Sequence, residues 1–264
     1  MLHNRTTALS LLLLLSPFCA SAAQFILPLH LPPHLPGLEK GEPAKFRLGL
    51  GYAGASADGI LVSGPGGYWE LAAPGPGKLA YSVRGSGFLL SGKVDSFSIG
   101  HKSGGGLAGA LEGSIIAAPW GKDAARLYTG LIFGITILGV RDPAIFQLLD
   151  GRSRAEPSSA FSLQLGLPFG ALFPVALGGS WKGEAQADLT IFPAGVTFFS
   201  YGLAGPTAYG STRKTGMQFS LGCRAGAVYA PWGLRLEALG RFSPRGNDRG
   251  TFSWWAFQAA LKLF

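Results

Sequence analysis

Long stretches of this sequence alternate residue by residue between apolar side chains and polar side chains or glycine. The clearest stretch covers residues 217–229, where Gln218, Ser220, Gly222, Arg224 and Gly226 fall between apolar neighbours. A period of two places successive side chains on opposite faces of a β-strand. The same alternation recurs at 44–52, 79–84, 182–191, 234–242 and 252–264. The sequence therefore predicts an all-β fold with many strands.

The composition indicates which face of those strands points outward. Apolar residues make up 47% of the chain and charged residues only 14%, whereas soluble domains average about 25% charged. The longest mainly apolar run in the body of the chain, 131–140, has ten residues, and a membrane helix needs about 20. A lipid-compatible chain without a spanning helix predicts a transmembrane antiparallel up-and-down β-barrel, apolar outside and polar inside.

Residues 1–23 have the pattern of a secretory signal peptide. Arg5 precedes an apolar core at 8–19, and Ala20-Ser21-Ala22 forms a small-residue cleavage site. We therefore expect a cleaved signal peptide at 1–23, a Pro-rich segment at 24–43 and a barrel at 44–264. The export signal argues against a nucleic-acid partner, although the whole chain carries a net charge of +8.

The final predicted strand, 252–264, closes on the aromatic residue Phe264. In this feature, and over about 44–264, the chain resembles bacterial outer-membrane β-barrel proteins. The resemblance implies an outer-membrane location, contact with outer-membrane lipids, insertion by the barrel insertion machinery and a monomeric state.

The number of strands depends on how two segments are interpreted. About 11 strands are evident, but single-chain bacterial barrels have an even number. The preferred solution splits 159–179 at Pro168 and gives about 12 strands, with about 10 as the alternative count. A different solution finds the missing strand within 58–72, which reverses the orientation of the chain from there to about residue 160. We expect Pro-containing periplasmic turns at 118–121, 192–195 and 230–233, and outer loops at 55–77, 141–158, 203–215 and 244–251.

The inward face of the predicted barrel carries an excess of basic residues. The predicted lumen-lining charges are Lys45, Arg47, Arg84, Lys182, Glu184, Asp188, Arg224, Arg235, Glu237, Arg241 and Lys262. A basic lining would make a pore selective for small anions. In a narrow barrel, however, such charges can also form a paired network that fills the interior. Inward glycines at 49, 51, 222 and 226 favour open volume, and 24–43 is a candidate plug.

One short motif could carry chemistry. Positions 97, 99, 101 and 103 share a strand face, and a histidine beside a serine can activate the hydroxyl for attack on an ester. The pair His101 and Ser103 resembles the site of outer-membrane phospholipase A and the lipid A deacylases. The resemblance implies Ser103 as nucleophile, His101 as base and a third polar residue that orients the histidine. Glu112 is the candidate for that third role, but it shares the lumen face and would need a bulge.

Other motifs favour simple structural explanations. The glycine-rich segment 104–109 fits G-x-G-x-x-G but precedes a strand rather than a helix, so it predicts a hairpin and not a nucleotide site. His30 and His34 have no third ligand nearby, and Cys223 acts as a small apolar residue. We therefore expect no cofactor and no metal.

Three functions follow from these patterns. The first is passive: a narrow channel or structural barrel with a basic lumen. The second is a lipid ester hydrolase that uses Ser103 and His101. The third is a surface interaction barrel that works through its outer loops. The balance of the sequence evidence favours a non-enzyme.

Overall fold

The computed structural model describes residues 44–57, 60–96, 100–122, 125–140, 157–202, 209–215, 218–244 and 251–263. Within these residues, no helix has the length and hydropathy needed to cross a membrane. The strand segments are β1 (Lys45–Ala57), β2 (Ile60–Pro74), β3 (Leu79–Ser96), β4 (Gly100–Lys122), β5 (Ala125–Val140), β6 (Pro157–Ala176), β7 (Trp181–Gly202), β8 (Tyr209–Thr215), β9 (Gln218–Tyr229), β10 (Leu234–Pro244) and β11 (Thr251–Lys262).

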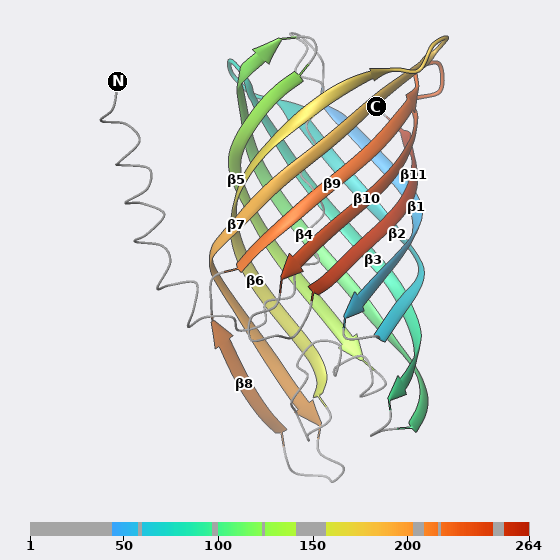
Figure 1. Cartoon of the computed structure of the whole chain (residues 1–264), viewed down its shortest axis with the longest axis vertical. Helices are drawn as coiled ribbons and strands as arrows, with labels where there is room; N and C mark the ends of the chain where they lie inside the picture. The colour runs from blue at the N-terminus through green and yellow to red at the C-terminus, as the bar shows by residue number, and fades with distance from the viewer. Residues whose placement is uncertain are drawn as a thin grey trace, which may run out of the picture.

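These strands close into an antiparallel barrel (Figure 1). Strand β1 pairs with β2 on one side and with β11 on the other, so the sheet has no open edge at this point. Strands β8 and β9 follow one another along β7: β8 pairs with Val196–Gly202 and β9 with Trp181–Phe192. With β8 and β9 counted as one strand, the eleven described segments form a ring of ten. The preferred count of twelve strands is therefore wrong, and the alternative count of ten is confirmed.

The predicted break at Pro168 does not occur, because β6 runs through it without interruption. Pro168 pairs with Thr190 on β7, and the β6–β7 register shifts nearby, between Leu165 and Leu167. On the other side, the β5–β6 ladder skips the residues between Gly166 and Phe169. A proline has no N–H to donate, and local ladder irregularities allow a strand to continue past it.

Two of the three predicted Pro turns also lie inside strands. Residues 118–121 belong to β4, where the register with β5 shifts between Ala117 and Trp120, and residues 192–195 belong to β7. Only 230–233 forms a turn, with Gly233 at a φ of 60° and its N–H bonded to the carbonyl of Ala230. Proline therefore marks bulges in this barrel more often than it marks chain reversals.

The predicted outer loop at 55–77 contains strand β2, so the strand that the alternative solution placed within 58–72 is present. The reversed orientation that belonged to that solution is wrong, because β4 ends at 118–122 beside the 75–78 turn, at the same end of the barrel as 230–233. Strand β2 is rich in glycine and proline at its centre, which hides its alternation. Similarly, the predicted loop at 203–215 contains β8. Residues 141–156 and 245–250, from the other predicted loops, lie outside the described residues, as do 1–43 and Phe264.

The two ends of the barrel differ in their connections. The turns at 75–78, 177–180 and 230–233 lie at the same end as the start of β1 and the end of β11, at the top of Figure 1. We call this the turn end and the opposite end the loop end. In bacterial outer-membrane barrels the short turns face the periplasm.

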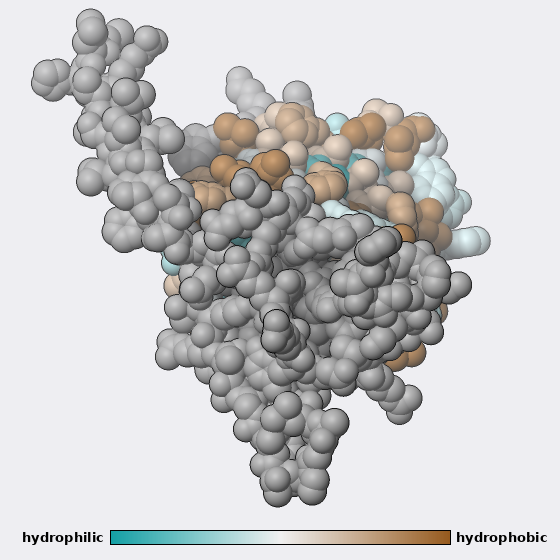
Figure 2. Space-filling model, turned by 60° about the horizontal axis from the view of Figure 1, so that its bottom comes forward, coloured by the Kyte–Doolittle hydropathy of each residue, from teal (hydrophilic) through white to brown (hydrophobic). Residues whose placement is uncertain are grey.

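The strand alternation separates two surfaces of opposite character. Outward side chains are apolar and exposed, as at Leu50, which is 76% exposed, while inward side chains such as Gln258 are buried. In Figure 2, apolar residues, in brown, gather on the part of the barrel that the grey atoms leave visible, with paler and teal residues among them. A wall of this kind belongs in lipid, because it has no partner surface within the described part of the chain.

Candidate functional site

The interior of the barrel contains a row of charges of alternating sign. Arg47, Glu70, Arg84 and Glu112 lie directly opposite one another on β1, β2, β3 and β4. All four are buried, and Arg47 Nη1 donates a hydrogen bond of 3.0 Å to Glu70 Oε2. Opposite charges in cross-strand positions stabilise a sheet. We call this row the ion ladder.

A second group of charges lies on the opposite wall, on β7, β9 and β10. Arg224 Nη2 is 2.6 Å from Glu184 Oε1 and 2.7 Å from Glu237 Oε1. Arg235 forms ion pairs with the same two carboxylates. To reach Glu184 on β7, Arg235 must extend across β9, where its own partner is Val228 and the partner of Glu184 is Gly226. We call these four charged residues the Arg-Glu cluster.

A third group lies one step nearer the loop end and is organised by Arg241, which is only 1% exposed. Its Nη1 donates to Ser220 Oγ at 2.6 Å, and its Nη2 lies 3.5 Å from Asp188 Oδ1. Thr190 donates a further hydrogen bond of 2.7 Å to the same oxygen of Asp188. Arg241 is therefore held in place by partners on two other strands.

Several of these interactions bridge strands that are not neighbours. Arg84 on β3 donates a hydrogen bond to Gln258 on β11, although β1 and β2 stand between these strands. Gln186 on β7 donates to the hydroxyl of Tyr128 on β5 at 2.6 Å, across β6. Such bonds tie separate parts of the wall together through the lumen.

An apolar layer fills the interior on the loop-end side of the ion ladder. Phe88 packs edge-on against Trp254, with ring centroids 5.8 Å apart. The inward residues of this layer, each at most 4% exposed, are Ala53, Ala55, Val62, Phe88, Leu90, Leu239, Trp254 and Ala256. Arg241 on β10 is the register partner of Trp254, so the apolar layer lies beside the Arg241 group at the same level of the lumen.

Most of the buried charges of this interior lie next to charges of opposite sign, and the remaining basic residues lie towards the turn end. The buried inward arginines are Arg47, Arg84, Arg224, Arg235 and Arg241, and the inward acids are Glu70, Glu112, Glu184, Asp188 and Glu237. A further arginine, Arg126, is half-buried in the inward phase of β5, two residues before Tyr128. Lys182 and Lys262 are exposed at the turn-end rim, where Lys45 is half-buried. Glu70 was not predicted as a lumen residue, because its strand was predicted as a loop. Its apolar neighbours Trp69 and Leu71 show the alternation that could have identified it as an inward residue of a strand.

Three of the four inward glycines named from the sequence do not leave open volume, whereas a Cβ at Gly226 would meet nothing closer than Cγ of Glu184 at 3.5 Å. A Cβ atom at Gly49 would lie 2.6 Å from Cε1 of Tyr68, and one at Gly222 would lie 2.5 Å from Oδ2 of Asp188. At Gly51, a Cβ would meet Cγ of Gln258 at 2.9 Å. These glycines make space for large inward side chains on neighbouring strands, so they contribute to close packing.

The structure does not bring the three proposed hydrolase residues together. Positions 101 and 103 lie at the loop-end start of β4, opposite positions 95 and 93 of β3, and their side chains lie outside the described part of the chain. Glu112 lies eleven residues further along the same strand, which corresponds to roughly 36 Å. It faces the lumen beside Arg84. His30, His34 and residues 97–99 lie outside the described residues.

No protein-family model matches the sequence, and no curated protein matches it. One similar solved structure is the translocator domain of the autotransporter NalP from Neisseria meningitidis, with 9% identity over 86% of this chain and 90% of that chain and a TM-score of 0.43. Another is an outer membrane channel from Pseudomonas putida, with 12% identity over 88% of this chain and 100% of that chain and a TM-score of 0.39. The transport unit of the Escherichia coli autotransporter AIDA-I is also similar (11% identity, 88% and 93%, TM-score 0.38).

These similarities are too distant to carry an argument about function. The fold class rests instead on the strand pairing and the surface of the chain itself, which is a closed antiparallel barrel with an apolar outer wall. This is the architecture of an outer-membrane β-barrel.

We predict that replacing Gly49 with alanine destabilises the barrel by about 1–3 kcal/mol, because the added methyl overpacks the interior. Besides the Tyr68 ring, the new Cβ would meet the backbone oxygen of Ala259 at 2.6 Å. The matched control is Gly113→Ala, whose Cβ would meet nothing within 4 Å. Urea unfolding in lipid vesicles, followed by tryptophan fluorescence, measures both variants. Equal unfolding midpoints would contradict the close packing.

Removing one acid from the Arg-Glu cluster tests the importance of its pairing. Glu237→Gln leaves Arg224 and Arg235 to share Glu184 alone, and we expect the free energy of unfolding to fall by about 3 kcal/mol. The control Lys182→Gln changes an exposed rim charge and should alter it by less than about 0.5 kcal/mol. The same unfolding assay applies, and a Glu237→Gln barrel as stable as the control would disprove the role of the cluster.

Proposed function

We propose that this protein is a sealed outer-membrane β-barrel that presents a projecting β-sheet at the cell surface. The observation that carries the proposal is the bridging of the lumen by side-chain interactions, with Arg84 bound to Gln258 and Arg235 bound to Glu184. A barrel of this kind works as a membrane anchor and as a support for its loop-end surface.

The two layers of the lumen would obstruct a solute in different ways. Passage through the charged layer requires buried ion pairs to separate, and breaking one such pair costs about 3–5 kcal/mol. Passage of an ion through the apolar layer around Phe88 and Trp254 is opposed by the loss of its hydration, as in hydrophobic gates. Together these barriers support a closed resting state.

The lengths of the strands support a function at the loop end. Strands β1 and β11 have 13 and 12 residues, while β4 and β7 have 23 and 22. A bilayer crossing takes about 9–11 residues. The excess of roughly ten residues, or about 30 Å, extends beyond the loop end. In Figure 1, β8 and the end of β7 lie in this extension. A projecting sheet offers a binding surface outside the membrane.

Conductance across a planar lipid bilayer tests the sealed lumen. We expect the wild-type barrel to show no steady open-channel current, because its interior is bridged. The double variant Arg84→Ala/Arg235→Ala removes both bridges and should produce discrete openings, whereas the rim control Lys182→Ala should remain closed. A heat-induced shift on denaturing gels verifies that each variant is folded.

The competing proposal is a narrow anion-selective channel, which is favoured by the exposed Lys182 and Lys262 at the rim. A steady, anion-selective wild-type current in the same experiment would establish the channel and overturn the sealed barrel.

Lipid ester hydrolysis at Ser103 and His101 is a separate proposal. Positions 101 and 103 have the same alternation phase along β4 as Leu107, which is 54% exposed on the outer wall. The prediction is fatty acid release from phospholipid or lipid A by the refolded protein in detergent. This release should vanish in Ser103→Ala and persist in Ser180→Ala, which changes a serine in a turn at the other end. Absence of release from the wild type would refute this proposal.

A further inference from the structure

The turn-end mouth of the lumen carries two exposed lysines, Lys182 on β7 and Lys262 on β11. Both continue the inward phase of their strands, two residues nearer the rim than Glu184 and Ala260. Neither lysine has an ion-pair partner among the described residues. Glu184, the inward acid next to Lys182 along β7, is already shared by two arginines. These two residues, which we call the mouth lysines, therefore add positive charge that the described acids do not neutralise.

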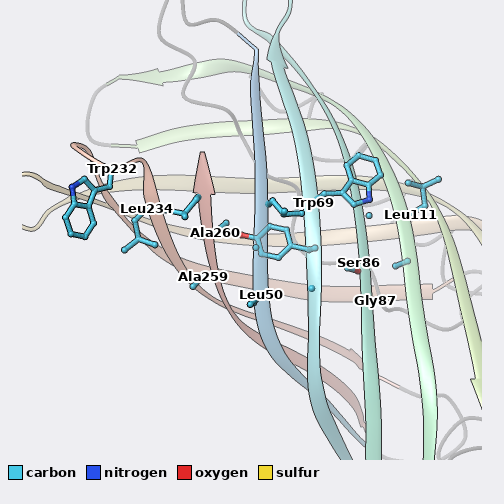
Figure 3. A pocket seen from close by; sticks show the side chains of 16 residues that line it. Leu50, Trp69, Ser86, Gly87, Leu111, Trp232, Leu234, Ala259 and Ala260 are labelled. Carbon is cyan, nitrogen blue, oxygen red and sulfur yellow. The ribbon is translucent and has the colours of Figure 1, made fainter. Parts of the chain in front are cut away.

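The backbone of Lys262 is fixed at the rim by hydrogen bonds on both sides of β11. Its own N–H donates to the carbonyl of Gly233 at 3.2 Å, and the N–H of the next residue donates to the carbonyl of Phe46 on β1 at 2.9 Å. Figure 3 shows the outer side of this stretch of wall, where Leu234 of β10 lies next to Ala260 of β11. Lys262 is therefore held beside the start of β1.

The segment 39–43, which leads into β1, brings two acids towards this mouth. Glu42 and Glu39 precede the first residue of β1 by three and six positions, so an extended chain allows them about 11 Å and about 21 Å from it. That first residue and Lys262 are diagonal neighbours across the β1–β11 pair, about 7–8 Å apart. Lys182 lies four strand spacings further round the wall, or about 19 Å. Each mouth lysine is thus within reach of one acid.

From this arrangement we propose that the segment before β1 binds across the turn-end mouth, with Glu42 next to Lys262 and Glu39 next to Lys182. Exposed ion pairs are individually weak, but the covalent connection to β1 keeps these acids near the lysines at an effective concentration on the order of millimolar. Pro43 restricts Glu42 to extended backbone conformations, so less conformational entropy is lost when this residue is held. The proposal uses only the rim and is independent of whether the lumen is sealed.

Trypsin cleavage after Lys40 reports on this contact, because the bond lies between the two acids. The refolded full chain in detergent micelles is digested at low salt, and mass spectrometry follows this one cleavage, whose rate measures the undocked fraction. We expect Lys182→Gln/Lys262→Gln to be cut about three- to tenfold faster than the wild type, since two exposed ion pairs are lost. The matched control Lys78→Gln removes an exposed lysine from the turn at 75–78, at the same end, and should be cut at the wild-type rate.

Salt gives a second measurement on the same proteins. At about 1 M salt, where the Debye length is about 3 Å, cleavage of the wild type should approach that of the double variant, whereas the double variant should change much less. A heat-induced shift on denaturing gels verifies that each variant is folded.

Equal cleavage rates in the wild type, the double variant and the control would overturn the proposal. Protection that increases with protein concentration would assign the mouth to the segment of a second copy of the chain, and would overturn it as well. The bilayer conductance experiment reports on the lumen separately, so failure of either proposal is recognised independently.

Discussion

The fold depends on the closure of its backbone hydrogen-bond ladder at β1 and β11. These strands pair from Arg47 opposite Lys262 to Ser56 opposite Ser253. In hydrocarbon there is no water to satisfy a free strand edge, so a membrane-spanning sheet must close on itself. Closure with ten strands also sets the diameter, and a small barrel is narrow enough for its own side chains to fill.

This narrow diameter explains the composition of the interior. Arginines are long enough to span the lumen, and Arg84 and Arg235 reach partners on strands that are not their neighbours. Glycine makes room for the partner of a third arginine, because a Cβ at Gly222 would lie 2.5 Å from Oδ2 of Asp188, which pairs with Arg241. The small glycines and the long arginines of the interior therefore depend on each other in the packing of the lumen.

The functional regions are consequently separated in space. The ion ladder and the apolar layer support a sealed core, and the extended ends of β3, β4, β6, β7 and β8 lie beyond the loop end. Each region can be altered without changing the others, since they use different faces or different ends of the strands. The hydrolase positions 101 and 103 belong to the loop-end region and are far from Glu112 along β4.

The sequence by itself determined the all-β class and the facing of most residues, because alternation is a local property that each strand carries in its own residues. It therefore predicted the inward Arg224, Arg235 and Glu237 from the regular strands β9 and β10. It did not determine the strand count. In the sequence, Pro168 and the Gly-Pro centre of β2 look like strand ends, and only pairing with the neighbouring strands shows that both strands continue through these residues. The pairing of the charges and the close packing of the interior were decided only by the tertiary structure. Whether Arg84 is free or bound to Gln258, and whether Gly49 faces space or Tyr68, depends on residues brought together from distant strands.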